Sequence, residues 1–202
     1  MIGDHPDISV FHAGGNHLII SETAVIDTNR LIQLGFHVQT ANKPASPKYP
    51  DEVSLNACLV GNRLFHKVSL SDKNITAQAY KNKWRLINVN QGYTKCSICV
   101  LDQNHIITAD MGIHKAAQQS GLNSLLISSG QIELDGYHAG FIGGACGKIA
   151  KDKIAFTGTL KYHKDENKIN DYIRSLGIKS IYLTDEPCFD IGSIIPLTYC
   201  VN

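Results

Sequence analysis

A polar turn followed by a short apolar segment recurs four times along the chain, and a repeat of this kind determines the architecture of the whole domain. The turns lie at Asn16, Asn62, Asn104 and Asp152, which are 46, 42 and 48 residues apart. Apolar residues also precede each turn, and asparagine and glycine tolerate the positive φ angles that tight turns require. We therefore predict four equivalent units, each of which begins with a β-hairpin.

A helical pattern follows each hairpin, and a further apolar strand follows each helical pattern. Three helical patterns end at a glycine that precedes an apolar residue, which is typical of a helix C-terminus; these glycines are Gly35, Gly121 and Gly177. Each unit thus has the order ββαβ over about 45 residues. The predicted helices cover residues 28–34, 71–83, 113–120 and 164–176, and the strands after them cover residues 36–38, 86–89, 125–127 and 181–183.

Four units account for the chain up to Glu186, and residues 190–197 have the pattern of the first strand of a fifth unit. An unpaired strand at a sheet edge invites aggregation, so we expect this segment to pair near the N-terminus and close a ring. The predicted fold class is α/β, a pseudo-symmetric ring of four full ββαβ units and a partial fifth, in one domain covering residues 1–202. The proline-rich residues 42–50 predict a surface loop between the first two units.

Composition excludes several classes of protein. Hydrophobic residues make up 43% and charged residues 18% of the chain, and the formal net charge is +1. Such a chain is too apolar to be disordered, and its charge gives no attraction to nucleic acid or to an anionic membrane. No apolar run reaches the roughly 18 residues of a spanning helix, and residues 1–7 lack the features of a secretion signal, which predicts a cytoplasmic protein. Six cysteines are too few for a disulfide scaffold, so reduced thiols are expected, and a homo-oligomer is left open.

Four stretches, in order along most of the chain, resemble a known family. They are QGYTKCS at 91–97, IITAD at 106–110, GFIGGACGK at 140–148, and DEP at 185–187 running into DIGSIIPL at 190–197. The sequence is similar to an uncharacterised family of short bacterial proteins assigned to the pentein fold, the pseudo-fivefold α/β propeller of the guanidino-group-modifying enzymes. The resemblance implies this fold and leaves the activity open, because the fold also has non-catalytic members, such as a ribosome anti-association factor.

The enzymes of the pentein fold include arginine and agmatine deiminases, dimethylarginine hydrolases and amidinotransferases. They use a cysteine nucleophile in the last repeat, a histidine that moves protons, and carboxylates that hold the guanidinium group. This chain has Ser193 where the last repeat would supply the cysteine, and Ala139-Gly140 follows His138 where the enzymes have His-x-Asp or His-x-Glu. Two functions are therefore open. One is a guanidino-modifying hydrolase or transferase that acts on a guanidino or amino-acid-like compound, and the other is a non-catalytic protein that binds a metabolite or a protein partner.

Cys96 is the candidate nucleophile, because polar residues surround it at the start of a strand and the adjacent Lys95 would lower the pKa of its thiol. The alternative is that Cys96 and Cys99 are two small residues of a buried strand. A zinc site is not expected, since no second cysteine pair with this spacing is available. His138 has the pKa range suited to general acid–base catalysis, although most of the nine histidines are expected on the surface.

Acidic residues at strand ends are candidate ligands for a cation, because loops at such ends carry binding sites in α/β folds. Asp110 and Asp190 occupy such positions, and two carboxylates at the ring axis would hold a guanidinium group. Asp110 is equally suited to cap the helix that follows it. Lys95 and Lys148 could pair with a ligand carboxylate or be solvated. The predicted axial pocket takes a small-molecule ligand without cofactor or metal, and it is rimmed by Asn56, Lys95, Cys96, Asp110, His138, Asp190 and Ser193.

Overall fold

The structure, a computed structural model, describes residues 5–43 and 48–197. In this part of the chain, twelve strands form four separate three-stranded sheets, one for each repeat. In every sheet the first two strands are an antiparallel hairpin, and the third strand pairs in parallel with the second. The sheets are β1 (Val10–His12), β2 (His17–Ile20) and β3 (His37–Thr40); β4 (Cys58–Val60), β5 (Arg63–His66) and β6 (Arg85–Asn88); β7 (Ile98–Val100), β8 (His105–Thr108) and β9 (Asn123–Leu126); and β10 (Cys146–Ala150), β11 (Lys153–Phe156) and β12 (Lys179–Tyr182).

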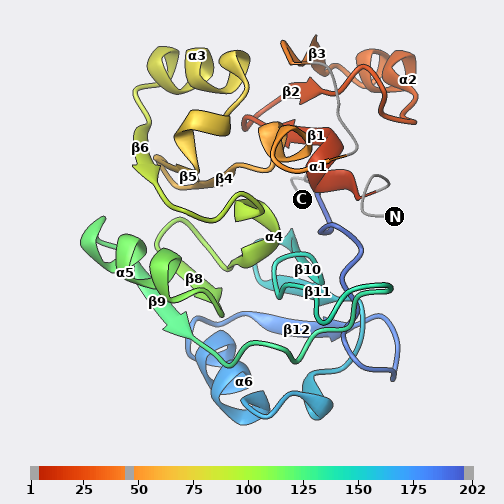
Figure 1. Cartoon of the computed structure of the whole chain (residues 1–202). Coiled ribbons are helices and arrows are strands. Elements are labelled where there is room, and N and C mark those ends of the chain that lie inside the picture. The colour runs from red at the N-terminus through yellow and green to blue at the C-terminus, as the bar shows by residue number, and fades with distance from the viewer. Residues whose placement is uncertain (1–4, 44–47, 198–202) are drawn as a thin grey trace.

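One helix connects the second strand of each sheet to the third, as a parallel pair requires. These helices lie at the periphery of the molecule, and the sheets surround a common centre (Figure 1). Three of the helices bury apolar side chains four residues apart, for example Ile113 and Ala117, so that one face packs on the sheet. All four predicted helices are found, as α2 (Thr28–Gln33), α3 (Lys73–Lys81), α5 (Met111–Gln119) and α6 (Glu166–Ser175).

The apolar core lies between neighbouring units rather than at one point. Among the described residues, one cluster joins the first and second units, another the second and third, and another the third and fourth. In the second of these, Phe65 of β5 packs in the same cluster as Ile98 and Ile106 of the next sheet. Each unit is therefore stabilised by its neighbours, as in other repeat proteins.

Residues 190–197 connect the last unit to the first. The N–H of Ile194 donates to the carbonyl of Cys146 in β10 (3.0 Å), and the N–H of Asp7 donates to the carbonyl of Gly192 (3.0 Å). Ile195 packs against the apolar cluster of the first unit. The segment thus closes the ring as predicted, but it does not form the predicted strand. Gly192 and Ser193 have φ angles of 78° and 72°, which are incompatible with an extended strand.

Short turns complete the units. One-turn helices precede three of the first strands: α1 (Pro6–Ser9), η2 (Asp51–Leu55) and α4 (Thr94–Ser97). Two further turns, η3 (Val68–Leu70) and η4 (Leu160–Tyr162), follow second strands. The predicted loop 42–50 lies partly outside the described residues, and its residues 48–50 are exposed. No helix in the described part of the chain is long and apolar enough to cross a membrane.

Candidate functional site

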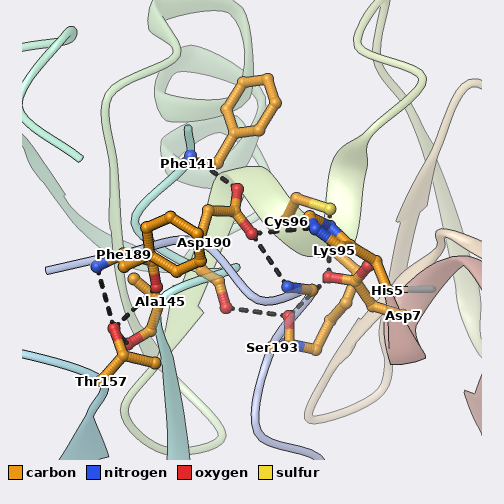
Figure 2. Close-up of polar contacts among 12 residues, drawn as sticks. His5, Asp7, Lys95, Cys96, Phe141, Ala145, Thr157, Phe189, Asp190 and Ser193 are labelled. Atoms are coloured by element: carbon orange, nitrogen blue, oxygen red, sulfur yellow. Dashed lines mark hydrogen bonds and ion pairs between the residues drawn. The ribbon is translucent and has the colours of Figure 1, made fainter. Parts of the chain in front are cut away.

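Side chains from the first three units and from residues 190–193 meet at the centre of the ring, and the fourth unit contributes the backbone of Gly143 and Gly144. Figure 2 shows Asp7, Lys95, Cys96, Asp190 and Ser193 with their side chains directed toward one another. We call these residues, together with Asn56, the axial cluster. Most of its side chains are buried, with exposed fractions of 0% for Asp7 and Asn56, 1% for Asp190, and 2% for Cys96 and Ser193.

Asn56 joins the first three units. Its Oδ1 accepts from the backbone N–H groups of Lys95 (2.7 Å) and Cys96 (3.3 Å). Its Nδ2 donates to the carbonyl of Asp7 (3.1 Å) and to Cys96 Sγ (3.2 Å). These four contacts use the two donors and two acceptor positions of the amide. Asn56 therefore acts as a fixed support of the cluster and has no capacity left for a ligand.

Asp7 is the acidic centre of the cluster. Its Oδ2 accepts from the Cys96 thiol (3.0 Å) and from the Ser193 hydroxyl (2.6 Å). Its Oδ1 is buried and has no hydrogen-bond partner among the described residues. The sequence analysis missed Asp7. The repeat itself held the signal, because Asp7 stands shortly before Val10, the first residue of β1, as Cys96 stands before β7.

Cys96 lies in α4, and its thiol is protonated in this arrangement. Burial is the main cause that raises the pKa of Cys96 well above its ordinary value, and the carboxylates of Asp7 and Asp190 raise it further. The thiolate is the nucleophilic form, so the thiol is held in an unreactive state here. The cysteines that the structure describes are all free and buried, and Cys200 lies outside the described residues.

Asp190 and Ser193 bring the end of the chain to the axis. Asp190 accepts from the N–H of Phe141 through Oδ2 and from that of Gly192 through Oδ1, both at 2.9 Å. Burial raises the pKa of Asp190, and these two bonds act in the opposite direction. His5 Nδ1 lies 3.8 Å from its Oδ1. A Cβ atom on Gly144 would lie 1.9 Å from Asp190 Oδ1, so only glycine allows the turn of the fourth unit to approach so closely.

Lys95 connects the axial cluster to a cavity of about 170 Å³, which we call the axial channel. Its Nζ donates to Ser193 Oγ (3.1 Å). Burial acts to lower the pKa of Lys95, and the carboxylate of Asp7 acts to raise it; the net shift of the pKa is upward, so the ammonium form persists. The first strands of all four sheets line the channel together with the end of the chain; its lining is Val10, Phe11, His12, Ala57, Cys58, Leu59, Lys95, Val100, Cys146, Gly147, Lys148, Ile194, Ile195 and Pro196.

Two predicted site residues lie away from the axial cluster. His138 is exposed in the segment between β9 and β10. Asp110 is the N-cap of α5, where its Oδ1 accepts from the N–H of Ile113 (2.8 Å), and it lines a different cavity.

No hydrogen bond joins a histidine to a thiol in the part of the chain described. The same residues contain no group of three or more histidine, cysteine or acidic side chains that could hold a metal.

The ring has a counterpart among solved structures. It is similar to DDAH from Pseudomonas aeruginosa, a cysteine-to-serine mutant complexed with citrulline, with a TM-score of 0.51 and 13% sequence identity. The match covers 94% of this chain and 71% of the DDAH chain. At this identity the likeness concerns the fold, and it confirms the predicted pentein-type ring. The sequence matches no curated protein. The family model described as "Family of unknown function (DUF6873)" matches residues 1–195, and the chain therefore belongs to that family.

Proposed function

We propose that this protein binds a small amino-acid-like compound in the axial channel, with Lys95 holding the carboxylate of the ligand. The observation that carries the proposal is the Lys95 ammonium, which lines the channel and also contacts the axial cluster through Ser193. A ligand in the channel would thus contact the residues that join the units.

The basic side chains that line the axial channel favour a ligand with an anionic group. His12, Lys95 and Lys148 are basic, and no described lining residue is acidic. A lysine ammonium has three donors, and the bond to Ser193 uses one of those of Lys95. The remaining donors suit a carboxylate, and charge-assisted bonds of this kind are strong. The citrulline complex of DDAH supports an amino acid as ligand class.

The proposal is tested with arginine and with agmatine, which is arginine without its carboxylate. Calorimetric titration is expected to show that citrulline and arginine bind, and that agmatine binds at least about tenfold more weakly. Loss of one hydrogen bond to a charged group costs about 1.5–3 kcal/mol of binding free energy, and about 1.4 kcal/mol corresponds to a tenfold change in the dissociation constant. The variant Lys95→Met is expected to weaken citrulline binding by the same factor.

A matched control is Lys151→Met, which removes one positive charge from an exposed turn outside the channel. It should bind citrulline as the parent protein does, and circular dichroism establishes that both variants are folded. Agmatine binding as tight as that of arginine, or unchanged binding by Lys95→Met, would show that the channel does not recognise a carboxylate through Lys95.

A second candidate function is covalent guanidine chemistry at Cys96, which the hydrogen bond from its thiol to Asp7 favours. In this candidate Asp190 attracts the cation and the thiol proton passes to Asp7 Oδ2. The sulfur adds to the guanidinium carbon as the C=N π bond opens, and one amine then leaves with the proton that Asp7 returns. Asp7 replaces His138 as the proton acceptor, because His138 is exposed on the surface. A guanidinium beside the thiol stabilises the thiolate, so its binding lowers the pKa that burial raises.

Alkylation kinetics test this second candidate. With neutral iodoacetamide, Cys96 is expected to react about tenfold faster for each unit of pH between 7 and 9, because the thiolate fraction rises tenfold per unit below a raised pKa. The rate of each reagent with Cys96 is divided by its rate with a free cysteine peptide. This ratio is expected to be at least about tenfold larger for cationic 2-chloroacetamidine than for iodoacetamide. Mass spectrometry of the parent and of Cys96→Ser locates the label. Equal relative rates for the two reagents would exclude a guanidinium-binding nucleophile.

A further inference from the structure

A second cavity, of about 240 Å³, lies between the third and fourth units and is here called the lateral cavity. It shares none of its described lining residues with the axial channel. An apolar cavity of about 150 Å³ binds benzene, so this volume admits a small organic molecule. Its wall comes from the start of α5, the segment that follows β9, the segment before β10, and the residue after η4; the lining is Ser97, Ala109, Asp110, Ile127, Ser128, Ser129, Gly130, Gln131, Ile132, Ala139, Gly140, Phe141, Ile142 and His163.

His163 lines this cavity and carries an unpaired donor. Its side chain is buried, with an exposed fraction of 5%, and its Nδ1 accepts from the N–H of Asp165 (3.0 Å). Because Nδ1 is an acceptor, the proton of the neutral ring is on Nε2. Burial lowers the pKa of His163, which keeps the ring neutral. Nε2 has no hydrogen-bond partner in the part of the chain that the structure describes. A buried donor without an acceptor is costly, so an acceptor atom that reached Nε2 would be bound favourably.

Asp110 gives the wall of the lateral cavity its negative charge. Its Oδ1 is occupied by the N–H of Ile113 at the start of α5. It is the only acidic residue of the described lining, and no lysine or arginine lines the cavity. With His163 neutral, the wall therefore has a net negative charge. The apolar side chains of Ile127, Ile132 and Phe141 line the same space, so an apolar body fits between the two polar groups.

We propose that the lateral cavity is a binding site for a small organic cation with an apolar body and a hydrogen-bond acceptor. The cationic group pairs with the carboxylate of Asp110, and the acceptor takes the Nε2–H of His163. This site is separate from the axial channel, and it does not depend on the function proposed there.

The test is made on the full chain with three small molecules of similar shape. Tyramine has an ammonium group, an aromatic ring and a phenolic oxygen; phenethylamine lacks the oxygen; and 3-(4-hydroxyphenyl)propionate has a carboxylate instead of the ammonium group. We expect NMR titration to show that tyramine binds and shifts the backbone signals of residues 127–132 together with the Nε2–H signal of His163. Phenethylamine should bind about fivefold more weakly, and the anionic probe at least about tenfold more weakly.

Two variants preserve the local structure while removing one interaction each. Asp110→Asn keeps an oxygen to cap α5 and removes the charge, and His163→Asn keeps an acceptor for the N–H of Asp165 and removes the free donor. We expect Asp110→Asn to weaken tyramine binding at least about tenfold and His163→Asn about fivefold. Asp27→Asn, which alters the exposed N-cap of α2, is the matched control and should have no effect.

The outcomes separate this site from the axial channel. Tyramine binding that Lys95→Met abolishes and Asp110→Asn does not would place the probe in the axial channel and overturn the proposal. So would the absence of any shift in residues 127–132 at millimolar tyramine, which would mean that the lateral cavity holds water only. Tighter binding of the anionic probe than of tyramine would show that the charge preference is wrong.

Discussion

Replacing Asp7 by alanine is expected to lower the free energy of unfolding by about 3–5 kcal/mol, the usual cost of removing one member of a buried charged group. Asp7 is fully buried and accepts from Cys96 and Ser193, and Ser193 in turn accepts from Lys95. Without the carboxylate, the Cys96 thiol loses its acceptor and the Lys95 ammonium loses the negative charge that offsets its burial, while the Ser193 hydroxyl keeps only the carbonyl of Gly143 (2.8 Å). Urea unfolding followed by circular dichroism measures the change.

The control is Asp135→Ala, which removes an exposed carboxylate and is expected to change stability by less than about 0.5 kcal/mol. The double variant Asp7→Ala with Lys95→Met isolates the interaction of the two charges. We expect its loss of stability to be at least about 1 kcal/mol smaller than the sum of the two single losses, because both charges are then absent. Strict additivity, or a loss under about 1 kcal/mol for Asp7→Ala alone, would show that the axial cluster does not stabilise the ring.

Replacing Gly147 by alanine is expected to detach residues 190–197 from β10 and to cost about 3 kcal/mol, the upper end of the range for overpacking. A Cβ atom on Gly147 would lie 1.9 Å from the carbonyl oxygen of Ile194, a backbone atom that cannot rotate away. Displacement of Ile194 breaks its bond to Cys146 and moves Ser193 away from Asp7. Limited proteolysis should therefore cleave within residues 190–197 at least about tenfold faster than in the parent protein.

Gly130→Ala provides a comparison for this experiment. Gly130 has a φ angle of 75° and no atom within 4 Å of an added Cβ, so alanine there adds backbone strain without a collision. We expect a cost of about 1–2 kcal/mol and no faster cleavage of residues 190–197. If Gly147→Ala behaved like Gly130→Ala in the proteolysis assay, closure of the ring would not depend on the close packing of residues 190–197 against β10.

The repeated units could be predicted because their signals are local. Turn residues, a helix stop at glycine and apolar strands recur at a steady spacing, and each of the predicted helices is found within three residues of its expected ends. The segment at the C-terminal end of the ring was harder to assign. Its apolar residues match a strand, but the positive φ angles of Gly192 and Ser193 arise from contacts with the first and fourth units.

For the candidate site, the sequence placed Asn56, Cys96 and Ser193 at the rim of an axial pocket, and in the structure all three are in hydrogen-bond contact with Asp7. Their part in binding or catalysis stays a prediction. Asp7 was not predicted, because the side chains that it contacts at the axis, Cys96 and Ser193, are 89 and 186 residues away in the chain. His138 is exposed, and nothing in its local sequence distinguishes an exposed histidine from a catalytic one.

The sequence by itself determined the ββαβ unit, the number of units and the strands that line the centre, because these depend on turn chemistry and on the period of apolar residues. Only the tertiary structure decided which polar side chains face one another. The Cys96 thiol is protonated because burial raises its pKa and because Asp7, 89 residues away in the chain, lies 3.0 Å from it. The unpaired donor of His163 likewise depends on which groups burial leaves without a partner. Burial and long-range proximity set the charge state of a group, and neither property belongs to a single segment of sequence.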